Sequence, residues 1–358
     1  MDVFAGALLL YSLLLAETAY LAFRGRNVPW RDIAADLASG HLPMWLCRGL
    51  EIAGFAWIAS HAPVHVLDGL PRAVQWAVAF VVWDLSFYWL HRLHHAIPFL
   101  WKIHVVHHQG EAYGFSLGIR NAWFSSLTSL PFFVPMALLG FGAELFVAVG
   151  SVHYFVQFWN HSALAGKLGV LESVMVTPTH HRVHHGRQRE YIDCNFGGTL
   201  VLWDKLFGSF RQELPDVPLL YGVEGDAPRS NPIDANLGPF APASAGFRTS
   251  VRLAAHPARD RFVGLAGLIL FTLLLQYVRE APHWTWTVRL GWGAIVTMAT
   301  CALGAYADGR SKAFAIWIVT GPVACLVASV WLDSIWIGLV GLLLAALSAW
   351  HAREVAKP

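Results

Sequence analysis

The residues in this sequence whose types and spacing could do chemistry are histidines repeated at one interval. Residues 91–95, 104–108 and 181–185 all have the form His-x-x-His-His. On a helix, positions i, i+3 and i+4 share one face, with Cβ atoms about 5–6 Å apart. Each stretch therefore offers up to three imidazoles in one direction. Imidazole suits Fe, Zn, Cu or Ni. One ion takes only about four to six ligands, so three converging stretches predict two neighbouring metals.

A single stretch of this kind is more often a set of solvated histidines at a helix end near a membrane surface. Three stretches, all on one predicted side of the protein, favour metal binding instead, because clustered histidines at ligand spacing have few other causes.

A stripe of polar residues leads into the first stretch. Asp84, Tyr88, His91 and His95 fall at i, i+4, i+7 and i+11, on one face of a helix. Asp84 lies inside an apolar run, where a carboxylate is costly and usually functional. We expect it either to orient a metal-bound histidine, with Tyr88 supporting the same face, or to be buried against a polar group of a neighbouring helix. Glu111 would act like Asp84 or face water.

Two further histidines lie near the end of the apolar run SVHYFVQFWN. His161 follows this run and would complete the ligand set from a helix that carries no cluster. His153, about two turns earlier, is expected to be a buried, hydrogen-bonded histidine, or else to support a ligand or the substrate.

The elements that must position these residues are membrane helices. The chain is 56% hydrophobic and only 13% charged, whereas soluble domains carry about a quarter charged residues. Its apolar runs have the length of bilayer spans, and the net charge of +2 gives no reason to expect a nucleic-acid partner. We therefore predict an all-α, polytopic membrane protein. The expected spans are 4–22, 44–60, 73–90, 122–140, 142–160, 262–278, 285–304, 313–331 and 335–350.

Charge predicts the orientation of these spans. Residues 122–140 and 142–160 either cross fully or form a re-entrant hairpin; with the hairpin, all three histidine stretches share one side. All but three of the 25 Lys and Arg residues then fall on that side, which the positive-inside rule assigns to the cytoplasm. We expect a multi-pass protein of a bacterial inner membrane or the endoplasmic reticulum. The first run should be a retained span rather than a cleaved signal.

The expected organisation has four parts. Residues 1–72 hold N-terminal spans, 73–212 the catalytic core, 213–261 a cytoplasmic cap or linker, and 262–358 C-terminal spans. The polar residues 213–247 are rich in Pro and Gly, and they are expected to form a cap or loop rather than a helix. The four cysteines lie far apart, so neither a disulfide framework nor a thiolate zinc site is expected.

Several quoted stretches resemble the fatty acid hydroxylase/sterol desaturase superfamily of membrane di-iron oxygenases. These are HRLHH, LWKIHVVHHQGE, QFWNH, TPTHHRVHHG and NFGGTLVLWDKLFGSF, over roughly residues 80–212. Within the superfamily, TPTHHRVHHG, NFGG and LWDKLFGSF are most similar to the alkylglycerol monooxygenases. The family pattern is HX3H, HX2HH, HX2HH. It implies these ligands: His91, His95, His104, His107, His108, His181, His184 and His185. His94, where relatives often have another residue, is not expected to bind metal.

The resemblance implies a reaction as well. It implies iron rather than zinc, two ions, O2 as co-substrate, and hydroxylation of a long-chain lipid, with an ether lipid such as an alkylglycerol as a candidate. No fused cytochrome b5 motif, dinucleotide fingerprint or iron–sulfur cysteine set occurs in the sequence. Electrons should therefore come from a separate donor, either tetrahydrobiopterin or a ferredoxin- or cytochrome b5-type protein. The alternatives are a lipid or sterol desaturase of the same superfamily and, in another class, a membrane metal transporter or a non-catalytic metal-binding protein.

Overall fold

The structure, a computed structural model, describes residues 3–226, 228–241, 256–310 and 312–356. Over these ranges the chain is helical, and its only extended pairing is an isolated bridge between Met175 and Leu200. The predicted all-α fold is confirmed. The chain divides into two compact units. The first is Pro43–Glu224; the second combines Asp2–Leu42 with Gly225–Pro358.

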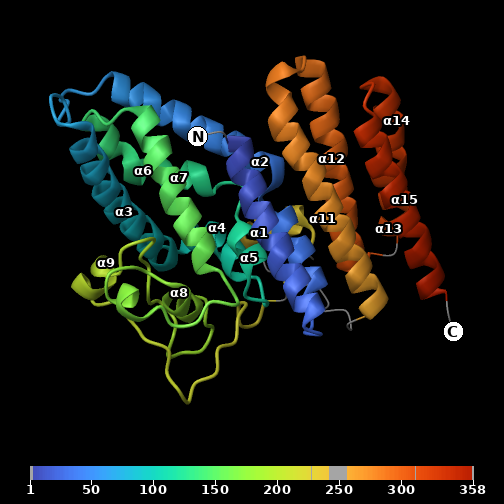
Figure 1. The fold of residues 1–358 in the computed structure, drawn as a ribbon, viewed down its shortest axis with the longest axis horizontal. Coiled ribbons are helices and arrows are strands. Elements are labelled where there is room, and N and C mark those ends of the chain that lie inside the picture. Colours follow the sequence, from blue (N-terminus) through green and yellow to red (C-terminus); the bar gives the residue numbers. More distant parts are fainter. Residues whose placement is uncertain (1–2, 227, 242–255, 311, 357–358) are drawn as a thin grey trace. The chain divides into compact units, whose positions relative to one another are not determined.

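The first unit is built around α3, which packs against α4, α6 and α7 (Figure 1). Its helices are the second half of α2 (Trp30–Ser60), α3 (Arg72–Ala96), α4 (Pro98–His108), α5 (Phe115–Ile119), α6 (Ser125–Leu138), α7 (Ala143–Asn160), α8 (Pro178–His184) and α9 (Leu202–Leu206). Large aromatic side chains fill the core. The rings of Phe55 and Phe146 stack at 4.0 Å, and the fully buried Trp83 lies 5.0 Å from Phe133. This packing fixes the helices that carry the histidines.

A proline makes the corner between the first two histidine stretches. Pro98 disfavours helical geometry in the residue before it, and Ile97 is extended, with φ −98° and ψ 117°. α3 therefore ends at Ala96, and α4 begins at Pro98, a position where a missing N–H costs nothing. The sharp turn brings residues 91–95 and 104–108 together.

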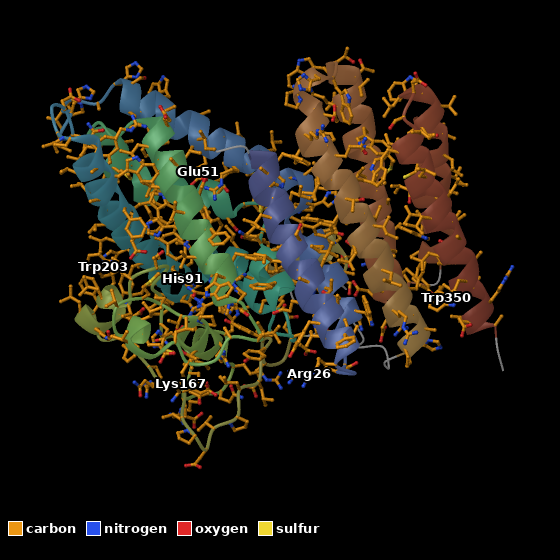
Figure 2. The ribbon with its side chains drawn as sticks, in the orientation of Figure 1. Arg26, Glu51, His91, Lys167, Trp203 and Trp350 are labelled. Atoms are coloured by element: carbon orange, nitrogen blue, oxygen red, sulfur yellow. The ribbon has the colours of Figure 1, made fainter. Side chains whose placement is uncertain are left out.

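The loop-rich segment 161–224 gathers at the C-terminal ends of α3 and α7 (Figure 1). It contains α8, α9 and a 3-10 turn at Gly169–Ser173. α8 starts after the extended Thr177, again with a proline at its first position. Among the labelled residues of this unit, His91 lies towards this end, as do Trp203 and Lys167 (Figure 2).

Six helices of the described chain are long and apolar enough to cross a membrane. They are Phe4–Phe23, Arg72–Ala96, Pro257–His283, Trp286–Ala307, Ala313–Trp331 and Ile335–Val355. They correspond to six of the nine expected spans, and the chain is a multi-pass membrane protein. The other three expectations fall on α2, α6 and α7, which are helical but do not meet these criteria. α6, for example, has only 14 residues and contains Pro131 and Pro135.

The second unit packs α1 (Val3–Phe23) and a C-terminal helical bundle. The bundle consists of α11 (Pro257–Glu280), α12 (Trp286–Ala307), α13 (Ala313–Ile318), the π-helix Val319–Val323, α14 (Ala324–Trp331) and α15 (Ile335–Val355), with a 3-10 turn at Ala281–His283. α11 contacts α1, α12 and α15. The fully buried Phe262, Trp292 and Trp317 form its core. The first half of α2 also belongs here and ends at a kink, where His41 has φ 44°.

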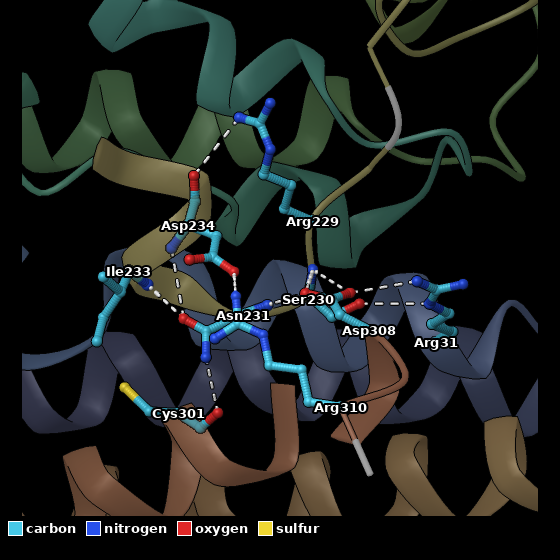
Figure 3. A network of polar contacts seen from close by, with 9 residues as sticks. All are labelled: Arg31, Arg229, Ser230, Asn231, Ile233, Asp234, Cys301, Asp308 and Arg310. Atoms are coloured by element: carbon cyan, nitrogen blue, oxygen red, sulfur yellow. Dashed lines mark hydrogen bonds and ion pairs between the residues drawn. The ribbon is translucent and has the colours of Figure 1, made fainter. Parts of the chain in front are cut away.

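One expectation about the polar segment is wrong. Within 213–247, α10 (Pro232–Leu237) is a short helix followed by a 3-10 turn. The Asn231 side chain accepts from the N–H groups of Ile233 (2.9 Å) and Asp234 (3.4 Å), which caps the helix, and Pro232 occupies its first position. Asp308 accepts from the N–H groups of Ser230 and Asn231, which ties this helix to α12 (Figure 3). The part of the expected cap at 242–255 lies outside the described residues.

Candidate metal centre

The structure gathers nine histidines into two groups beside the corner between α3 and α4. Within each group, the ligand nitrogens all lie within 4.8 Å of one another. The five-histidine group is His91, His95, His104, His108 and His184; the four-histidine group is His107, His161, His181 and His185. These nine are the histidines selected from the sequence. Metal binding by them stays a prediction.

The five-histidine group takes two residues from α3, two from α4 and one from α8. Nε2 of His104 lies 3.1 Å from Nε2 of His91 and 3.2 Å from Nε2 of His108. The Nε2 atoms of His95 and His184 are buried and have no hydrogen-bond partner among the described residues. Five imidazole nitrogens therefore point into one small buried volume.

The four-histidine group is built from α4, the end of α7, and α8. Nε2 of His161 is its centre, at 3.1 Å from Nε2 of His181, 3.2 Å from that of His185 and 3.3 Å from that of His107. His161 directly follows α7, and a Cβ at Gly118 would lie 3.1 Å from its Nδ1. Glycine at that position leaves room for the ring.

Backbone oxygens decide which nitrogen of several rings carries the proton. Nδ1 lies 2.9 Å from the Phe196 oxygen in His91, and 2.8 Å from the oxygens of Cys194, Arg120 and Gln157 in His184, His107 and His161 respectively. A carbonyl only accepts, so each of these Nδ1 atoms must donate. Their Nε2 atoms therefore keep a lone pair.

The pair His107 and His161 then tests whether a metal fits. Both rings protonate Nδ1, so two Nε2 lone pairs face each other at 3.3 Å with no proton between them. This contact is repulsive unless a cation accepts both lone pairs. A neutral ring that donates through Nδ1 and offers Nε2 is the usual form of a metal-bound histidine. The residues present fit metal ions.

Burial keeps these rings neutral. It is the largest cause that lowers the pKa of the histidines on α4, and it lowers that of His107 to about 4. Burial likewise lowers the pKa of the three histidines of the third stretch, with neighbouring imidazoles adding to the effect. Metal ligands must be deprotonated, and these rings meet that requirement near neutral pH.

His94, which was not expected to bind metal, and His153, which was expected to be buried and hydrogen-bonded, lie outside both groups. Nδ1 of His94 bonds the Leu90 oxygen at 2.8 Å, and its Nε2 bonds Oγ1 of Thr128 at 3.0 Å. His153 is fully buried, and its Nδ1 lies 2.7 Å from Oγ1 of Thr199.

Asp84 does not touch a predicted ligand, so the expectation that it orients one is corrected. Its two oxygens accept from the backbone N–H groups of Thr199 and Leu200, both at 3.0 Å, and from Nε1 of Trp203 at 2.9 Å. His153 lies 3.2 Å away. A buried carboxylate collects every available donor, and here the loop after NFGG supplies more of them than the histidines do. The alternative, burial against neighbouring polar groups, describes it.

Tyr88 does not contact a predicted ligand. Its hydroxyl bonds Oγ of Ser209 at 2.8 Å and accepts from Arg92 at 2.8 Å, which stabilises the loop-rich segment around the histidines. Glu111 lies beside Gly222, where a Cβ would be 3.0 Å from its Cγ, and a role for it at the metal centre stays a prediction.

Three arginines of this unit donate to its own backbone oxygens. Arg92 donates to the Phe207 oxygen at 3.2 Å, Arg120 to the Val106 oxygen at 2.5 Å and Arg182 to the Pro178 oxygen at 3.1 Å. Arg120 is 1% exposed, so it lies inside the unit.

Sequence reasoning missed the partners that orient the five-histidine group. Oδ1 of Asp193 lies 3.2 Å from Nδ1 of His95. The backbone oxygens of Cys194 and Phe196 accept hydrogen bonds from Nδ1 of His184 and His91. Asp193 stands two residues before NFGG and could have been suspected as a carboxylate near a conspicuous motif. Every residue type has a backbone oxygen, so the sequence alone gives no sign of such a partner.

Comparisons with known proteins agree with this geometry. Residues 76–209 match the family model described as fatty acid hydroxylase. The chain is 35% identical over 209 residues to an alkylglycerol monooxygenase of Danio rerio, covering 57% of this chain and 46% of the relative. It is 31% identical over 146 residues to an ornithine lipid hydroxylase of Rhizobium tropici, covering 40% and 44%. A cholesterol 25-hydroxylase of Homo sapiens is 29% identical over 134 residues, covering 37% and 49%.

The chain spans about half the length of these relatives. No solved structure matches it with significance. All nine clustered histidines lie inside the matched region. Residues 76–209 are therefore similar to the fatty acid hydroxylase family.

Proposed function

We propose that this protein is a membrane di-iron oxygenase that hydroxylates a long-chain lipid. The observation that carries the proposal is the pair of adjacent all-histidine groups, which share the helices α4 and α8, inside the region that matches fatty acid hydroxylases. Relatives described as alkylglycerol monooxygenase and ornithine lipid hydroxylase support a lipid substrate, and the former make an ether lipid the first to test. The catalytic core would be residues 73–212, which include every histidine of both groups.

Each group would hold one ion through its Nε2 atoms. Imidazole alone does not choose between iron and zinc, but oxidation of a C–H bond requires a metal that changes its oxidation state. When bound, the two irons would supply the activation of O2. In the overall reaction, one oxygen atom enters the C–H bond and the other leaves as water, with two electrons and two protons taken from a donor.

The chain's own residues would position these ions and keep water out. His91, His184, His107 and His161 donate through Nδ1 to backbone oxygens, which holds each ring in one orientation. The residues of the four-histidine group on α7 and α8 are nearly inaccessible to solvent. Such a site protects an oxidising reaction from side reactions with water.

The electron donor would be a separate molecule, either a reduced pterin or a ferredoxin- or cytochrome b5-type protein. The four cysteines are free in the structure and do not form a cluster. We place the histidine groups on the cytoplasmic side of the membrane. The distribution of Lys and Arg among the loops supports that placement.

Purified protein in detergent, loaded anaerobically with Fe2+, tests the function. We expect near two irons per chain and, with a reductant and 18O2, one labelled oxygen atom in an alkylglycerol, an ornithine lipid or a sterol. His108→Ala is the matched inactive control, and His94→Ala the matched active one. An alkene without label would indicate a desaturase, and a protein that binds only zinc and converts no lipid would refute the oxygenase.

A further inference from the structure

Four consecutive residues orient three of the five histidines in one group. In the strip 193–196, Oδ1 of Asp193 lies 3.2 Å from Nδ1 of His95. The Cys194 oxygen accepts a hydrogen bond from Nδ1 of His184 (2.8 Å), and the Phe196 oxygen accepts one from Nδ1 of His91 (2.9 Å). The rings come from α3 and α8, so the strip sets the angle of ligands from two helices at once.

The strip has an unusual backbone. Asp193 and Asn195 have φ 56° and 53°, a left-handed conformation that residues other than glycine rarely adopt. Alternating this conformation with ordinary backbone points the oxygens of residues 194 and 196 towards the histidines. Asn and Asp tolerate it better than most residues do.

Side chains from the same segment hold the strip in this shape. The Asn195 amide donates to the oxygens of His180 (3.0 Å) and Arg211 (2.8 Å), and its oxygen accepts from the Arg211 N–H. Asp204 accepts from the N–H of Phe196 at 2.7 Å and from that of Gly197 at 2.8 Å. A Cβ at Gly197 would lie 2.7 Å from Oδ2 of Asp204, so the close approach needs glycine.

A short chain of polar contacts extends from Asp204 to α3. Its Oδ1 accepts from the Ser209 hydroxyl at 2.7 Å, and Ser209 bonds the Tyr88 hydroxyl at 2.8 Å. Both Asp204 and Tyr88 are fully buried. Tyr88 lies less than one turn before His91 on α3, so one network fixes both the ligand's helix and the backbone oxygen that the ligand bonds.

The four-histidine group does not use the strip. Its oriented rings bond the backbone oxygens of Arg120 and Gln157, and Nδ1 of His181 has no hydrogen-bond partner among the described residues. The ring hydrogen bonds of the strip therefore all go to the five-histidine group, and its contact on the side of the four-histidine group is the bond from Asn195 to the backbone oxygen of His180.

We propose that Asp204 is a positioning residue for the five-histidine group rather than the four-histidine group, acting through the strip 193–196. This inference rests on the proposed function, because it concerns how tightly the five-histidine group would hold its iron. Partners that orient metal ligands typically change metal affinity by about 10–100-fold when removed. The two metal affinities of the protein should therefore be separable by mutations that touch no ligand.

The test uses the full chain in detergent, loaded anaerobically with 57Fe2+ and measured by Mössbauer spectroscopy and by iron content during chelator titration. In wild type we expect two iron populations of equal size. Asp204→Asn, which replaces one of two acceptors with a donor, should weaken one population by roughly 10–100-fold and leave the other unchanged. Asp216→Asn makes the same change at an exposed position of the same segment and should alter neither.

A second pair of variants guards against misfolding. The Asp193 side chain is 63% exposed, so Asp193→Gly removes the partner of His95 without opening the core. It should weaken the same population by about tenfold, and Asp193→Asn, which still offers an oxygen, should restore it. Equal weakening of both populations, or of neither, would overturn the inference. A wild-type protein without iron would instead refute the proposed function.

Discussion

The two histidine groups draw on the same short helices but divide each stretch differently. In residues 104–108, His104 and His108 join the five-histidine group while His107 joins the other. In residues 181–185 the assignment is reversed, because His181 and His185 join the four-histidine group and His184 joins the five.

Helix geometry explains this division. Residues i and i+4 differ by about 40° around the axis, whereas i+3 and i+4 differ by about 100°. The outer histidines of each stretch therefore act as a pair, and the middle one points to a different place. Of the up to three imidazoles that a stretch was expected to offer in one direction, each stretch therefore offers two. In residues 91–95 the pair joins the five-histidine group, and the middle residue, His94, leaves both groups.

Substitution of adjacent histidines from different groups should have the largest effect. His184→Ala and His185→Ala change neighbouring residues that serve different groups. We expect each variant to lose one iron of the two and all detectable hydroxylation, since both ions are needed. Mössbauer spectra of the two variants should lack different populations. Loss of the same population in both would show that the grouping is wrong.

Metal removal should separate the groups next. The five-histidine group has one more histidine and a carboxylate partner at His95, whereas Nδ1 of His181 has no hydrogen-bond partner in the part of the chain that the structure describes. We expect a chelator to empty the four-histidine group first, by a margin of about tenfold in rate or concentration. Iron content against chelator concentration measures this. A single-step release would show that the two ions leave together.

Asp84→Asn should affect the stability of the fold more than it affects metal binding by either histidine group. Asp84 is fully buried and accepts from three donors, and an amide in its place turns one acceptor into a donor that faces another donor. We expect unfolding to become easier by roughly 1–3 kcal/mol, with both irons retained at saturation. Thermal unfolding of the iron-free protein measures the loss, and Asp68→Asn, an exposed position, is the control. Selective loss of one iron would make Asp84 a part of the metal centre after all.

The sequence predicted which histidines come together better than it predicted their surroundings. The resemblance to the family pattern implied eight of the nine histidines that converge, and the place of His161 after an apolar run supplied the ninth. Asp84 was also recognised as important, because a carboxylate in an apolar helix is costly. Its actual partners, two N–H groups and an indole, lie more than 100 residues away along the chain. No local pattern encodes that pairing.

Membrane helices were predicted with similar unevenness. Long apolar helices such as α11 and α12 follow from hydropathy alone. α6 and α7 pack on α3 inside the first unit, so their apolar character reflects a protein core as much as a bilayer. The helix α10 was missed because its six residues are too few to show a period, although Asn231 before Pro232 is a recognisable start.

His94→Ala should have the smallest effect on metal and is the sharpest check on the ligand assignment. The ring bonds Leu90 and Thr128 and does not reach either group, so we expect both irons and full hydroxylation to remain. Because the residue is buried, losing its two hydrogen bonds should still lower stability by roughly 1–3 kcal/mol. Iron content and thermal unfolding, measured on the same preparation, separate these two effects. Loss of iron from His94→Ala would mean that the first stretch contributes three ligands, and that helix geometry does not decide which of its histidines bind.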